Sequence, residues 1–149
     1  MSQVERGRAG ASIESLRRIA DALGVTIADL FQDAGPTRPR VVRRGDRPAL
    51  AFGVLGRKML LTQKPLHHLE VFVGELAPGG SSGREAYTHG HSEELVVVLR
   101  GRVALELGNE VYELEDGDSI GYWSSTPHRI STVGDEPAEV MWVISPPSY

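Results

Sequence analysis

Short apolar runs separated by turn residues fill the chain from Ala49 onward. Glycine, proline, asparagine and aspartate stand between the runs, which are rich in β-branched residues. No segment between them resembles a crossover helix, so the strands are expected to pair mainly antiparallel. About a hundred residues of such strands predict a sandwich or a small barrel. The runs are Leu69–Leu76, Leu95–Leu99, Val103–Leu107, Val111–Leu114 and Val140–Ile144.

Turn residues predict where these strands reverse. Gly108-Asn109 separates two of the runs and suits a two-residue hairpin. Gly79-Gly80, Asp116-Gly117 and Gly134-Asp135 mark further expected reversals.

The N-terminal part of the chain follows a helical pattern instead. Apolar residues recur at three- and four-residue spacings between Ser12 and Gly24, which predicts one helix with Ser12 as its N-cap and Gly24 just past its end. Thr26 is expected to cap a second short helix, Ile27 to Phe31, with Asp29 completing a capping box. Two such short helices bury little surface alone, so they are expected to dock on something else.

Composition bounds the class of protein. The chain has 149 residues, of which 40% are hydrophobic, and no cysteine, which excludes a disulfide framework, a thiolate metal site and a thiol nucleophile. No long apolar run or signal-like start is present, so we expect a soluble, cytoplasmic protein that does not contact a membrane.

Charge is distributed unevenly along the chain. Residues 1–48 carry nine arginines against six acids, whereas residues 49–149 carry seven basic residues against fourteen acids. Residues 35–48 are rich in arginine and proline and have the composition of a linker. The split suggests two modules, 1–34 and 49–149, with any surface that faces a polyanion at the N-terminal end.

A cluster of potential metal ligands precedes one of the apolar runs. His89, His91 and Glu94 lie within six positions, and His128 follows a turn-rich segment. Three imidazoles and one carboxylate held on rigid strands can bind one divalent transition metal. On a continuous strand, however, Glu93 and not Glu94 shares the side of the two histidines. The alternative is a set of polar side chains that hydrogen-bond in a barrel mouth without an ion.

Aromatic residues near the cluster can line a ligand cavity or simply pack in the sheet. Tyr87, Tyr122 and Trp123 are the candidates for ligand binding. No catalytic residue is predicted: Ser124-Ser125 near His128 lacks a recognisable aspartate partner and a nucleophile elbow, which argues against a hydrolase.

Two segments of the second module resemble the paired motifs of the cupin family. Gly83-x5-His89-x-His91 followed by Glu94-x6-Gly101 resembles the first motif, and Gly117-Asp118 through Pro127 and His128 resembles the second. The resemblance implies a mainly β fold, the cupin double-stranded β-helix or jelly-roll-like barrel. It also implies that Glu94 is the acidic ligand, and that Fe, Zn, Mn or Ni is the bound metal.

The spacing between His91 and Glu94 is shorter than in the usual cupin motif. One reading aligns His89 with the second histidine of the family and Tyr87 with the first, which makes His91 a loop residue. The site is then His89, Glu94 and His128. The other reading keeps all four ligands.

The N-terminal segment resembles the end of an XRE-type (lambda-repressor-like) helix-turn-helix domain. The resemblance rests on Ser2-Gln-Val-Glu5-Arg6-Gly7-Arg8 and on the stretch from Ser12 to Val25. It implies a short α-helical remnant, truncated at its N-terminus, in which Gln3, Arg6 and Arg8 contact DNA. Joined to a cupin, it implies a homodimeric transcriptional regulator whose barrel binds a small-molecule effector.

Two other functions are compatible with these residues. Two histidines and one carboxylate with open coordination positions suit a metal-dependent enzyme, either a non-haem iron oxygenase or epoxidase or an isomerase. The chain also distantly resembles an oxygen-dependent epoxidase family that carries helices before a cupin. A stand-alone small-molecule-binding cupin is the third possibility.

Overall fold

The computed structural model divides the chain into two units, Met1–Pro39 and Arg40–Tyr149. The division falls inside the segment 35–48 that the composition indicates as a linker. Each unit is described by itself. The residues described are 12–31, 39–64, 66 and 68–148.

The first unit contains the longer predicted helix, α2 (Ile13–Leu23). The Ser12 side chain accepts a hydrogen bond from the backbone N–H of Ser15 at 3.1 Å, which satisfies a donor of the first turn. Gly24 ends the helix with a φ of 67°, a left-handed conformation that costs glycine little. Ala20 is the buried residue of this helix, whereas Ile13 and Leu23 are exposed.

The shorter helix, α3 (Ile27–Leu30), begins with the expected capping box. The backbone N–H of Asp29 donates to the Thr26 hydroxyl at 3.2 Å, and the Asp29 carboxylate accepts from the backbone N–H of Thr26 at 2.7 Å. Phe31 serves as its C-cap. The predicted DNA contacts, Gln3, Arg6 and Arg8, lie outside the described residues. None of the helices in the described part is long and apolar enough to cross a lipid bilayer.

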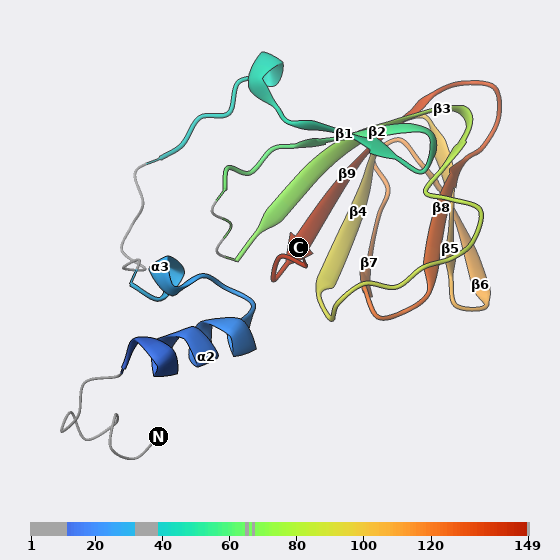
Figure 1. The fold of residues 1–149 in the computed structure, drawn as a ribbon. Helices are drawn as coiled ribbons and strands as arrows, with labels where there is room; N and C mark the ends of the chain where they lie inside the picture. Colours follow the sequence, from blue (N-terminus) through green and yellow to red (C-terminus); the bar gives the residue numbers. More distant parts are fainter. Residues whose placement is uncertain (1–11, 32–38, 65, 67, 149) are drawn as a thin grey trace. The chain divides into compact units, whose positions relative to one another are not determined.

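The second unit is an antiparallel β structure, as the alternation of runs and turns predicts (Figure 1). After the short 3-10 helix η1 (Arg44–Asp46), its strands form one nearly closed sheet in the order β6-β5-β8-β3-β9-β4-β7, with β2 joining β1 to β3. The fold is the expected cupin-type barrel. The strands are β1 (Ala49–Phe52), β2 (Val54–Leu60), β3 (Glu70–Ser81), β4 (Glu93–Arg100), β5 (Arg102–Leu107), β6 (Glu110–Glu115), β7 (Ser119–Trp123), β8 (His128–Thr132) and β9 (Ala138–Ser145).

The barrel interior is built by strict side-chain alternation. On β4, Val96 and Val98 point inward and are fully buried, whereas Leu95 is exposed. They pack in one apolar cluster with Val140 and Trp142 of β9. Since every second residue of these strands faces the interior, a polar residue at an inward position must find its partners inside the barrel.

Gly79-Gly80 does not reverse the chain, and this turn prediction is wrong. Strand β3 continues through both glycines to Ser81, which pairs with Ser131 of β8. Gly79 has a φ of 79°, and a β-carbon at Gly80 would crowd the backbone of Ala77. The two glycines therefore let the strand bend from its pairing with β2 and β9 toward β8.

Gly74 lies at a position where the barrel leaves no room for a larger side chain. A β-carbon at this position would overlap the ring of Trp142, whereas a β-carbon at Gly45 meets no atom within 4 Å. We expect Gly74→Ala to lower the free energy of unfolding by about 1–3 kcal/mol through overpacking. Gly45→Ala should change it by less than about 0.5 kcal/mol, the range of ordinary surface substitutions. Urea denaturation of both variants checks this, and equal stabilities would contradict it.

Candidate metal centre

Glu94 is a carboxylate placed inside an apolar barrel. It occupies an inward position of β4, two residues before Val96, and only 1% of it is exposed. Its partner across the sheet is Tyr122 of β7, also inward-facing, whose hydroxyl donates a hydrogen bond to the Glu94 carboxylate. The exposed Glu93 points to the other side of the same strand. Of the two adjacent acids, only Glu94 is therefore buried in the barrel interior, where it can take part in the site.

His128 opens strand β8 with its ring oriented by the backbone. Its Nδ1 lies 2.7 Å from the carbonyl oxygen of Thr126, and because a carbonyl only accepts, Nδ1 must carry the proton. In the neutral ring this leaves Nε2 as a lone-pair donor. The Nε2 atom is buried, lies 3.7 Å from Oε2 of Glu94, and has no hydrogen-bond partner in the described part of the chain.

His89 comes from the loop between β3 and β4, so the loop's own contacts must position it. Its backbone N–H donates to the carbonyl of Ser124 at 3.1 Å. Three residues later, the backbone N–H of Ser92 donates to the buried Ser124 hydroxyl at 2.8 Å, and the Ser92 hydroxyl donates to the carbonyl of Pro146 at 2.7 Å. Ser92 and Ser124 were not singled out from the sequence as positioning residues, because their contacts are long-range.

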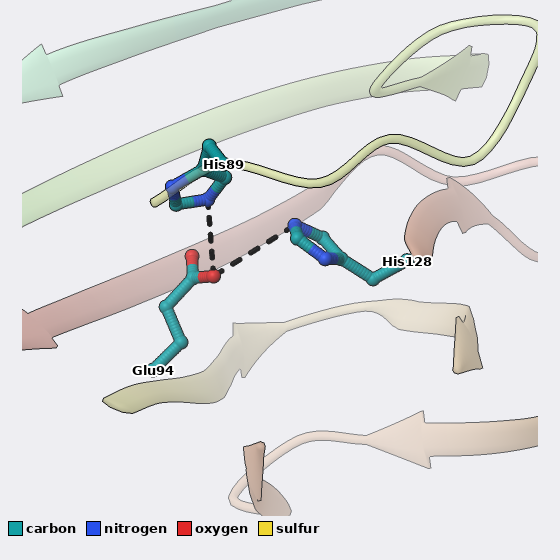
Figure 2. Close-up of side chains that lie close together, drawn as sticks. All are labelled: His89, Glu94 and His128. Atoms are coloured by element: carbon teal, nitrogen blue, oxygen red, sulfur yellow. Dashed lines mark ion pairs between the residues drawn. The ribbon is translucent and has the colours of Figure 1, made fainter. Parts of the chain in front are cut away.

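The three side chains converge on one point (Figure 2). His89 Nε2 lies 3.2 Å from Oε2 of Glu94, and the rings of His89 and His128 are 5.3 Å apart in an edge-to-face arrangement. One ligand atom from each residue lies within 4.8 Å of those of the other two. Two imidazole nitrogens and one carboxylate oxygen on one side of an ion are the donor set typical of non-haem iron sites.

The electrostatics of the cluster fit a cation at this point. Burial raises the pKa of the Glu94 carboxyl, since the charged form loses its hydration. Burial also lowers the pKa of both His89 and His128, which favours the neutral rings that ligate metals. A divalent transition metal would stabilise the charged form of the Glu94 carboxylate, which burial disfavours. It would also bind the lone pair on Nε2 of His128. The residues therefore fit a metal such as Fe, Zn, Mn or Ni.

His91 lies outside this cluster. Its ring is exposed and stacks on Trp123 at 4.9 Å between ring centroids, and its Nδ1 lies 3.3 Å from the Ser125 hydroxyl. The turn at Gly90, with a φ of 48°, interrupts any strand between His89 and Glu94. Glu93 would share one side with His89 and His91 only on a continuous strand. This segment is not a continuous strand, so that prediction does not hold here. The structure therefore agrees with the reading in which His89, Glu94 and His128 form the site and His91 is a loop residue.

The three aromatic residues that were predicted to line a ligand cavity do not all face the same side of the sheet. Tyr87 stacks on His89 with centroids 5.7 Å apart and lies 4.5 Å from the ring of His128, so it borders the centre. Tyr122, inward on β7, lies 5.0 Å from the ring of His128. Trp123, the next residue along β7, points outward and is 52% exposed, so it does not line the interior.

A cavity of about 400 Å³ adjoins the centre through Tyr87. Its lining includes Lys58, an inward residue of β2 whose ammonium lies 4.1 Å from the ring centroids of both Phe52 and Trp142. Burial lowers the pKa of Lys58 to about 8. Lys58 was not singled out from the sequence; its signal is a lone lysine two positions before the buried Leu60 on one strand.

Residues 72–144 match the family described as a cupin domain. The match runs from β3 to β9 and includes His89, Glu94 and His128. The second unit therefore has the fold of this family over these residues. The match does not extend to the helices α2 and α3.

Comparison with individual proteins gives the same fold. An uncharacterized protein of Methanocaldococcus jannaschii is 36% identical over 67 residues, which span 44% of this chain and 54% of that protein, about half its length. KdgF from a Halomonas species has a TM-score of 0.62 at 15% identity, covering 74% of this chain and 96% of the other. A cupin-2 domain from Rhodospirillum rubrum has a TM-score of 0.60 at 21% identity, with coverages of 76% and 80%. HppE in its iron(II) form has a TM-score of 0.63 at 21% identity, with coverages of 89% and 76%.

Metal uptake by single variants tests which histidines are ligands. We expect His128→Ala and His89→Ala to weaken zinc binding by well over about tenfold, the lower limit for loss of even an outer-shell partner. His91→Ala, the matched control, should retain one zinc per chain with the affinity of the unaltered protein. Competition titration against a fluorescent zinc chelator gives both values. An equal loss in His91→Ala would contradict the three-ligand centre.

The lowered pKa of Lys58 predicts a specific pH dependence of stability. In the unfolded chain the lysine pKa is near 10.5, against about 8 in the fold, so between these values the unfolded state binds more protons. Stability due to this residue should therefore rise between pH 8 and 10.5, by on the order of 3 kcal/mol. The difference in unfolding free energy between the metal-free protein and Lys58→Met measures it. A difference independent of pH would contradict the assignment.

Proposed function

We propose that this protein is a metal-dependent cupin enzyme acting on a small organic substrate. The observation that carries the proposal is the convergence of His89, Glu94 and His128 beside a cavity of about 400 Å³. A structural cluster needs no such cavity, and a closed structural metal site would use a fourth protein ligand. Three ligands on one side leave positions open for substrate or dioxygen.

The chain's own residues prepare the centre for a reaction. The Thr126 carbonyl holds His128 in the tautomer whose Nε2 faces Glu94, and the Tyr122 hydroxyl orients the Glu94 carboxylate. Tyr87 covers the two imidazoles on the cavity side, so substrate must approach past it. A bound transition metal supplies Lewis acidity and, if it is iron(II), the capacity to react with dioxygen. An oxygenase or epoxidase reaction and an isomerisation are both compatible with this arrangement.

A regulatory role stays a second candidate. The helices α2 and α3 lie in the segment that resembles the end of an XRE-type helix-turn-helix domain, and an effector would occupy the same cavity. Under this alternative the ligand binds without being converted. The proposed DNA contacts, the homodimer and the response of an operator are untested predictions.

Turnover separates the two candidates. The protein loaded with iron(II), manganese(II), nickel(II) or zinc(II) is incubated with a small-molecule extract, and compounds are followed by mass spectrometry under air and under argon. We expect at least one compound to be consumed over many turnovers by one metal form. The metal-free protein and Glu94→Gln should leave it unchanged, because the centre is incomplete without the carboxylate.

The dependence on air then identifies the reaction class, since isomerisation needs no dioxygen. A compound that the metal-loaded protein retains on ultrafiltration, yet converts with none of the four metals, would contradict the enzyme proposal and favour the sensor.

A further inference from the structure

The cavity beside the metal centre has an apolar wall with few polar groups. Leu50, Phe52, Leu60 and Phe72 provide most of its apolar lining, and its volume falls in the range of small-molecule sites. Such a wall accommodates a compact apolar body, while the few polar groups decide which compounds enter.

Positive charge is concentrated at this cavity. The chain contains two lysines against fourteen arginines, and both lysines, Lys58 and Lys64, line the same cavity. Residues 49–149 otherwise carry an excess of acids. Lys64 is exposed, whereas Lys58 is partly buried between aromatic rings, so the positive charge extends from the solvent side inward.

The ammonium of Lys58 forms no close ion pair with a carboxylate of the described residues. The carboxylates of Glu94 and Glu70 stabilise its charge only at longer range. By contrast, its neighbour Arg57 points to the other side of β2 and forms an ion pair with Glu75 at 2.8 Å. The rings of Phe52 and Trp142 attract the ammonium, but they accept its N–H groups only weakly.

The lining also contains one acidic residue, Glu70. Glu70 is almost fully buried, and its Oε2 makes no hydrogen bond to any described residue. Burial raises the pKa of the Glu70 carboxyl, whereas a backbone hydrogen bond from Ser148 and the ammonium groups of Lys64 and Lys58 lower it. Two ammonium groups against one carboxylate give the lining an excess of positive charge, which favours a negatively charged ligand.

We propose that this cavity binds a small organic anion, with the anionic group on Lys58 and the apolar body against Leu60 and Phe72. The inference rests on the proposed function, because it names the substrate class of the same centre. Lys64 attracts the anion at the entrance, and Tyr87, which lines the cavity and stacks on His89, places the other end of the ligand beside the metal site.

A matched pair of probes tests the charge preference. Binding of 3-phenylpropanoate and its neutral analogue 3-phenylpropanamide is measured by calorimetry at pH 7, with the metal-free and the zinc-loaded protein. We expect the carboxylate to bind at least about tenfold more tightly in both forms, a difference of about 1.4 kcal/mol. Phenylpropylphosphonate, added as a third probe, distinguishes a carboxylate site from a general anion site.

Variants assign the preference to Lys58. Lys58→Met should reduce the ratio of the two affinities to below about threefold, while Arg57→Met, the adjacent control, should leave it unchanged. Lys64→Met alters an exposed residue, so its fold is not at risk, and it should weaken carboxylate binding severalfold. Lys58→Met should still take up one zinc per chain, because Lys58 is not one of the three proposed ligands, and this keeps the test separate from that of the metal centre.

Three results would overturn the inference. The first is an unchanged preference for the carboxylate in Lys58→Met. The second is a preference that exists only in the zinc-loaded form, since the carboxylate would then bind the metal instead of the lysine. The third is the absence of binding by all three probes.

Discussion

The burial of one carboxylate, that of Glu94, is the physical constraint that the surrounding structure must satisfy. Glu94 stands at an inward position of β4, where the next two inward residues are the fully buried Val96 and Val98. Removing a carboxylate from water is costly unless hydrogen bonds or a cation compensate. Tyr122 supplies one hydrogen bond, and the two imidazoles supply the geometry for a cation. Stability alone would favour an apolar residue at this position, so a buried carboxylate here indicates a function.

The barrel supplies the precision that this centre needs. Glu94 and Tyr122 face each other on paired strands, so the alternation of the sheet fixes their directions. His128 begins β8, which pairs with β3 and β5, and its ring is held by the backbone carbonyl of Thr126. Only His89 lies on a loop, and there two buried serines connect the loop to the strand ends. Ligands held in this way need little reorganisation on binding an ion.

Much of this arrangement could be predicted from the sequence, and the exceptions have physical reasons. The strand and turn pattern predicted an antiparallel sandwich or small barrel, because hydrophobic runs and turn chemistry are local signals. The resemblance to the cupin motifs then selected the barrel. The Gly79-Gly80 prediction was wrong because glycines serve both reversals and bends within a strand. The short spacing between His91 and Glu94 left two readings of His91 open, and the left-handed turn at Gly90 decides between them. Lys58 was missed because its significance comes from the cavity around it, which is assembled from distant strands.

The most direct test of this account is a crystal structure of the metal-loaded protein with anomalous diffraction measured at the metal edge. The account predicts one anomalous peak per barrel, with Nε2 of His89, Nε2 of His128 and a Glu94 oxygen at about 2.0–2.2 Å from it. A peak coordinated by His91, or an interior without a peak while metal binds elsewhere on the chain, would contradict it.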